Sequence, residues 1–107
     1  MANSTKGRRS VFNRPRPPRV VYICGHRITV KTVAKLVDGS TDLAGAYNGD
    51  TKTIYLLRHK DWAMTLWHEC IHAALHLTGA GEGLSLTKEE TIVVALENAL
   101  GPLVVKP

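Results

Sequence analysis

The sequence lacks any long hydrophobic run. Within its 107 residues no stretch of eighteen apolar residues occurs, so no segment predicts a transmembrane helix. The opening residues, MANSTKGRRS, also lack the apolar core that a secretory signal requires. We therefore expect a cytoplasmic protein that has no membrane partner.

Cysteine is scarce, with only Cys24 and Cys70 in the whole chain. This excludes a small scaffold held together by several disulfides, and in a cytoplasmic protein it favours two reduced thiols over one bridge. The length allows one domain with one hydrophobic core, so any active site must be built from the elements of that core.

Acidic residues are absent from residues 1–19, which contain six Lys or Arg and three of the five prolines. The prolines oppose helix and central strand, so we expect a basic, extended or disordered arm, followed by a single folded domain over residues 20–107. The arm could contact nucleic acid, but a few arginines are weak evidence for that, and we favour a solubilising tail. The domain itself is almost neutral, because eight basic residues are balanced by nine acidic ones.

The folded part begins with β-rich sequence. Two short runs, 20–24 and 28–33, flank Gly25-His26-Arg27 and predict a hairpin. Residues 34–48 are interrupted by glycines and predict a short helical or irregular stretch, and residues 52–58 predict a further strand.

Two helices are expected after the last strand. The first should run from an N-cap at Asp61 to about Thr78, and the second should cover 88–104, with Thr87 and Glu90 as a capping box. Helical spacing predicts a buried stripe on the first helix and an apolar face on the second; these comprise Met64, Trp67, Ile71 and Ala74, and then Ile92, Val93, Leu96, Leu100 and Leu103. The fold class is therefore α+β, a small antiparallel or mixed sheet with both helices packed on it and on each other.

The first helix contains His68-Glu69-Cys70-Ile71-His72, the pattern H-E-x-x-H. Residues four apart project from one side of a helix, so the two imidazoles can converge on one Zn²⁺. Glu69 is offset from them and can serve as the general base that takes a proton from a metal-bound water. The motif therefore predicts a zinc-dependent hydrolase.

A third protein ligand is needed. His76 is too far along the same helix axis to close around the ion, so the second helix is the better source. Glu90 is preferred because it lies beside the apolar face, whereas Glu89 becomes the alternative if Glu90 serves as the capping carboxylate. Glu97 is expected to be a solvated charge.

The stretch TIYLLRHKDWAMTLWHECIHAALHLTG, followed by EETIVVALENAL, resembles the small phage- and plasmid-encoded metallopeptidases related to the ImmA/IrrE group of zincins. The resemblance implies a minimal zincin-like fold and zinc held by His68, His72 and Glu90, with Glu69 catalytic. It also implies that the strand TIYLL forms the sheet edge that aligns an extended peptide. The host cytoplasm would be the location if a phage encodes the chain.

We therefore expect a zinc metalloendopeptidase that acts on a protein or peptide. The alternative is a zinc-stabilised binding module, for a protein or nucleic acid, without physiological proteolysis; a third hypothesis is a small domain without metal. Tyr47, Tyr55 and His59 flank the motif and are weak candidates for stabilising an oxyanion.

Overall fold

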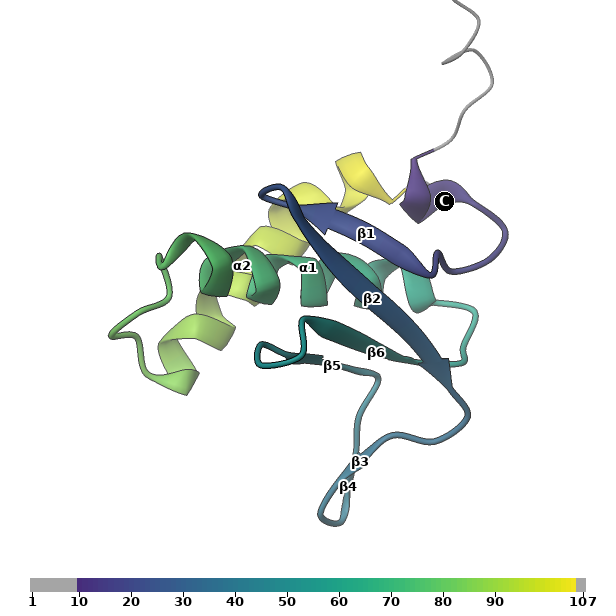
Figure 1. The fold of residues 1–107 in the computed structure, drawn as a ribbon, viewed down its shortest axis with the longest axis horizontal. Coiled ribbons are helices and arrows are strands. Elements are labelled where there is room, and N and C mark those ends of the chain that lie inside the picture. Colours follow the sequence, from purple (N-terminus) through teal and green to yellow (C-terminus); the bar gives the residue numbers. More distant parts are fainter. Residues whose placement is uncertain (1–9, 106–107) are drawn as a thin grey trace, which may run out of the picture.

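A computed structural model of the chain describes residues 10–105. Its main sheet has the strand order β1-β2-β6-β5, and helix α1 lies against this sheet with α2 beside it (Figure 1). The elements run from the short 3-10 helix η2 to α2; their bounds are η2 Val11–Asn13, β1 Val20–Ile23, β2 His26–Val33, β3 Val37–Asp38, β4 Thr41–Asp42, β5 Gly45–Asn48, β6 Thr53–Leu57, α1 Trp62–Thr78 and α2 Leu86–Val104.

The predicted α+β class is confirmed. β1 and β2 form the expected antiparallel hairpin, and β2 pairs with β6 in parallel, so the sheet is mixed. The hairpin turn is formed by Cys24 and Gly25, which both have positive φ, 52° and 79°, as a tight two-residue turn requires. None of the helices within residues 10–105 has the length and apolar character that crossing a membrane requires.

The prediction for residues 34–48 was wrong. This stretch contains no helix: it forms the small β3–β4 hairpin, which projects away from the helices in Figure 1, and then β5. Two of its glycines allow strands to form here rather than interrupting them. Gly39 has a φ of 63° at the β3–β4 turn, and Gly45 lets β5 approach α1 closely.

Helix α1 begins after Asp61, which occupies the predicted N-cap position, although its side chain makes no capping hydrogen bond. The helix ends at Thr78, and the following Gly79 adopts the left-handed conformation. Its core row differs from the predicted stripe. Ile71 is buried, but Met64, Trp67 and Ala74 are only partly so. The side chains that join the strands in the core are those of Trp62, Leu66 and Cys70. The predicted stripe instead faces α2, since Met64 and Trp67 lie against Gly101.

Helix α2 packs on α1, and among the described residues it makes no comparable contact with the sheet, which corrects the prediction that both helices lie on the sheet. Of its predicted apolar face only Val93 is fully buried; Ile92, Leu100 and Leu103 are exposed. The row that faces α1 is instead Glu90, Val93, Glu97 and Gly101, so the side of α2 that meets α1 carries two carboxylates beside the buried Val93 and Gly101.

The N-terminal prediction applies only in part. Residues 1–9 lie outside the described range, and within residues 10–19 the 3-10 helix η2, Val11–Asn13, is partly buried against the helices rather than disordered. Phe12 of η2 meets Trp67 of α1 edge-on, with ring centroids 5.8 Å apart, and the side-chain amide of Asn13 donates to the carbonyl of Val104 at 3.2 Å. η2 thereby lies beside the C-terminal end of α2 (Figure 1).

Candidate metal centre

The two motif histidines lie one turn apart on α1 and face α2. Their ring centroids are 5.0 Å apart, and each side chain is 20% exposed, open enough for a small ligand to reach. The orientation of α1 fixes the positions of the two histidines. The opposite side of the helix is packed on the sheet through Trp62, Leu66 and Cys70. The imidazoles are therefore held at the edge of the core and not within it.

Glu90 of α2 lies between the two rings. One of its carboxylate oxygens is 3.1 Å from Nε2 of His68 and 3.0 Å from Nε2 of His72. One ligand atom from each of these three residues can be chosen so that all lie within 4.8 Å of one another. Atoms that bind one tetrahedral Zn²⁺ at about 2.1 Å lie about 3.4 Å apart, so the three groups fit such an ion with little movement.

The opposite nitrogen of each ring meets a second carboxylate. Nδ1 of His68 lies 2.7 Å from Glu97, and Nδ1 of His72 lies 2.7 Å from Glu89. A neutral ring that donates its Nδ1 hydrogen to a carboxylate presents a free electron pair at Nε2. Both electron pairs then point at the same oxygen of Glu90, an arrangement that a cation between them would relieve. Metal-binding histidines are commonly oriented by carboxylates in this way.

The pKa of His68 reflects the carboxylates around its ring. Burial lowers this pKa, but the hydrogen bond with Glu97 and the charges of Glu69, Glu90 and Glu97 outweigh burial and raise it. Four carboxylates, those of Glu69, Glu89, Glu90 and Glu97, surround two imidazoles, so the centre strongly favours positive charge.

Glu69 is the most buried carboxylate of the group, with 7% of the residue exposed. Burial raises its pKa, and the adjacent His68 and His72 oppose the rise. Its side chain is wedged against β5, because a Cβ on Gly45 would lie 3.1 Å from Cγ of Glu69 and 2.6 Å from Cγ2 of Thr65. A desolvated carboxylate next to two convergent imidazoles has the character of a general base.

The structure also places the residues that the sequence left open. The cap of α2 is Ser85, whose hydroxyl accepts from the backbone of Lys88 at 3.1 Å, so the predicted capping box at Thr87 and Glu90 was wrong. Glu90 is free of that role, and Glu89 instead contacts His72 from the outer side. Glu97 is not a solvated charge, because only 25% of its side chain is exposed and it contacts His68.

The remaining candidates lie apart from this group. His76 is exposed, and its Nδ1 lies 3.0 Å from the hydroxyl of Tyr47. His59 accepts a hydrogen bond from the backbone of Asp61 at the start of α1. Tyr55 is partly buried on β6. None of the three flanking residues Tyr47, Tyr55 and His59 lines the cleft at the metal centre.

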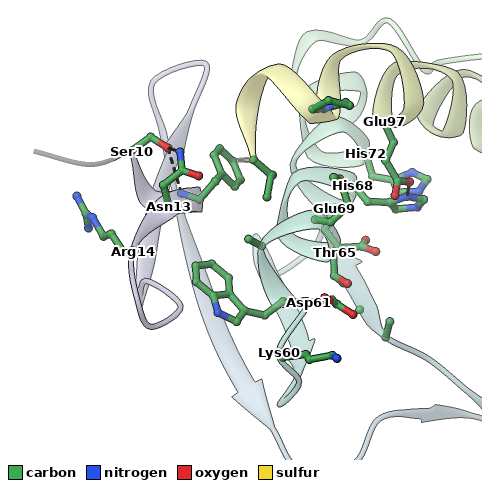
Figure 2. A pocket seen from close by; sticks show the side chains of 18 of the residues that line it. Ser10, Asn13, Arg14, Lys60, Asp61, Thr65, His68, Glu69, His72 and Glu97 are labelled. Atoms are coloured by element: carbon green, nitrogen blue, oxygen red, sulfur yellow. Dashed lines mark hydrogen bonds and ion pairs between the residues drawn. The ribbon is translucent and has the colours of Figure 1, made fainter. Parts of the chain in front are cut away.

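That cleft has a volume of about 1730 Å³. The side chains of His68, His72, Glu69, Glu90 and Glu97 line it at one end. Its walls also include β5 and η2, which the sequence did not predict to be near the motif (Figure 2).

The sheet edge beside the cleft is β5, not TIYLL. The stretch TIYLL is β6, which is paired on both sides, with β2 and with β5. The implied role of β6 as the edge strand was therefore wrong. Because the backbone of Leu57 donates to Ala44, strand alternation directs the backbone groups of Gly45 and Tyr47 away from β6, toward the open edge.

No family model, curated protein or solved structure matches the chain.

Proposed function

We propose that the protein is a zinc-dependent peptidase. The observation that carries the proposal is the convergence of both Nε2 atoms on Glu90, with each Nδ1 held by a separate carboxylate. His68, His72 and Glu90 would hold the ion. Two nitrogens and one carboxylate oxygen leave a fourth position open, as catalytic zinc sites do and structural sites do not.

When bound, zinc would lower the pKa of a water ligand to about 7 and polarise the substrate carbonyl. Glu69 would take the proton of the attacking water on its carboxylate and later deliver it to the leaving amine nitrogen. Its raised pKa suits this exchange, since a base whose pKa is closer to neutrality also returns the proton readily. Glu89 and Glu97 would keep the imidazoles in the binding orientation.

A peptide substrate would lie along β5. Gly45 and Tyr47 present backbone N–H and C=O groups at that edge, and Gly45 adjoins Glu69. An extended chain that pairs with this edge would pass beside Glu69, with its backbone fixed and its side chains alternately facing into and out of the cleft.

We also infer that the protein acts in the cytoplasm, of the host cell if a phage encodes it. The two cysteines support this inference, because Cys24 is exposed, Cys70 is buried and the two are not bonded to each other. Burial, with a smaller effect of Glu69, raises the pKa of the Cys70 thiol to about 12, which makes this thiol an inert part of the core.

Metal analysis and proteolysis together test the proposal. Purified wild-type protein is expected to hold about one zinc ion per chain. Glu69→Gln should keep the ion and lose hydrolysis of fluorescein-labelled casein, whereas His72→Ala should lose both. A wild-type protein that takes up no zinc refutes the proposal. Zinc retention without hydrolysis of casein or of a mixed library of quenched peptides would favour the binding module.

A further inference from the structure

The cleft has a second end, away from the metal centre, where its charge reverses. Arg14, the residue after η2, and Lys60, two residues before α1, both line the cleft and are exposed. Figure 2 shows Arg14 on the far side of the cleft from His68 and His72, with Lys60 near Asp61. The metal end, by contrast, is lined by Glu69, Glu90 and Glu97.

Packing fixes the position of Arg14. The preceding residues are attached to both helices: Phe12 packs edge-on against Trp67 of α1, and Asn13 donates to the carbonyl of Val104 in α2. Ser10 accepts from the backbone of Phe12 at 3.3 Å and closes the turn. The N-terminal segment thus forms a wall of the cleft, and Arg14 is part of that wall.

The positive charge of this end is poorly balanced. Asp61 is the one carboxylate beside it in the cleft lining, and Asp61 already lies 3.6 Å from a ring nitrogen of His59. The chain holds no Asp or Glu before Asp38. An anionic group that enters this end would therefore meet two cations, Arg14 and Lys60, and one competing carboxylate, Asp61.

We propose that the cleft selects peptides with acidic side chains on one side of the bond to be cut, and that Arg14 and Lys60 bind those side chains. This inference rests on the proposed peptidase function and names its substrate class. A peptide that pairs with β5 extends from Glu69 along the cleft, and residues a few positions from the scissile bond would reach the basic end. Arg14 can bind a carboxylate through two parallel hydrogen bonds, and Lys60 adds a second charge.

A peptide fits the cleft better than a nucleic acid does. A phosphate backbone is charged along its whole length, so at the other end of the cleft it would meet Glu69, Glu90 and Glu97. Bases would also find no open aromatic platform: of the two aromatic residues in the lining, Trp62 is only 9% exposed, and Phe12 is partly buried and packs edge-on against Trp67. An acidic peptide can confine its charges to one end.

Binding is best measured with the zinc-loaded Glu69→Gln protein, which should hold peptides without cutting them. The probes are fluorescein-labelled peptides of alanine and serine that carry a run of glutamates in either the N-terminal or the C-terminal half. Matched peptides carry lysines in the same places. Fluorescence anisotropy at about 0.05 M salt should show one glutamate peptide binding at least tenfold more tightly than its lysine counterpart. The half that is preferred gives the direction of the chain in the cleft.

Arg14→Glu and Lys60→Glu, each made in this background, should weaken binding of the preferred peptide about tenfold. Arg27→Glu is the matched control, because Arg27 is exposed on β2 outside the cleft and the reversal changes the net charge equally. An equal loss in all three variants, or no preference for glutamate peptides, overturns the proposal. So does oligothymidylate that binds as tightly as the best peptide and depends on Arg14 and Lys60.

The peptidase proposal fails in a different measurement. The peptidase proposal is tested by the zinc content and the hydrolytic activity of the wild-type chain. The preference for acidic peptides is tested only by peptide binding to the Glu69→Gln variant, which does not hydrolyse them. If the protein takes up no zinc, the same anisotropy series on the metal-free chain still decides whether the cleft prefers acidic peptides.

Discussion

Glu97 and His68 come from different helices, yet the carboxylate of the one lies 2.7 Å from Nδ1 of the other. The contact follows from the antiparallel register of α1 and α2, which also brings His72 opposite Glu89 and Met64 opposite Gly101. Glu90 and Glu97 are seven residues apart and thus share one side of α2. The same side of α2 therefore brings to α1 both Glu90, the proposed metal ligand, and Glu97, the carboxylate that orients His68.

Glu97→Gln should lower the affinity for zinc by about 10–100-fold, since the amide removes the charge that orients His68 and increases its basicity. The affinity can be measured by competition with a fluorescent chelator. Glu82→Gln, an exposed carboxylate of the loop between the helices, is the control and should leave the affinity unchanged. Wild-type affinity in Glu97→Gln would show that the contact with His68 does not support metal binding.

Glu90 and Glu89 should behave differently when each is replaced by glutamine. Glu90→Gln removes a ligand and should reduce the zinc content of the purified protein strongly. Glu89→Gln removes an orienting group and should keep the ion with an affinity lowered by about 10–100-fold. Equal retention of zinc in the two variants, or the reverse order, would contradict the assignment of Glu90 as the ligand.

Gly45→Ala should destabilise the protein by about 1–3 kcal/mol, because the new methyl group would lie 2.6 Å from Cγ2 of Thr65. Thr65→Ser removes Cγ2, the Thr65 methyl group that this new methyl group would meet. The free energies of unfolding of the two single variants and the double variant, measured in urea, should therefore be non-additive, with the double variant partly recovered. Additive losses would mean that β5 moves away from α1 without resistance. If Gly45→Ala keeps zinc but loses casein hydrolysis, the added methyl group has also displaced Glu69, which it would contact.

Glu69→Gln should stabilise the metal-free protein at alkaline pH. The raised pKa means that the native state binds more protons than the unfolded chain, so this carboxyl makes stability fall as pH rises from about its ordinary value of 4.5 through the raised value. Melting temperatures of chelator-treated protein should then favour Glu69→Gln near pH 8, and the difference should shrink near pH 4. The exposed Glu82→Gln variant is again the control. A wild type more stable than Glu69→Gln at alkaline pH would contradict the burial argument.

The H-E-x-x-H helix was predictable because its signals are local. Its start after Asp61, its end at Gly79 and the convergence of His68 and His72 all follow from spacing within one element. The partners of those histidines were harder to predict. Glu89 and Glu97 acquire roles only through the register between two helices, which depends on the loop that joins them. The spacing of Glu90 and Glu97 was the available signal, since it places both on one side of α2.

The sheet edge could not be predicted for a related reason. Whether a strand is central or at an edge depends on long-range pairing, and β6 gains β5 as a neighbour only through a segment that glycines made look irregular. Because glycine is common in turns, the sequence predicts an interruption at Gly45. Here its missing side chain is what allows the backbone to touch α1.

Helix α2 has only Val93 and Gly101 as buried residues, and the side chains that join it to α1 are mainly carboxylates directed at two histidines. If zinc binds there, the ion links α1 and α2 through ligands from both helices. Its binding free energy then adds to the stability of the native state, because the unfolded chain does not gather the same ligands. In a protein chain without its ion, α2 would then be the first element to detach.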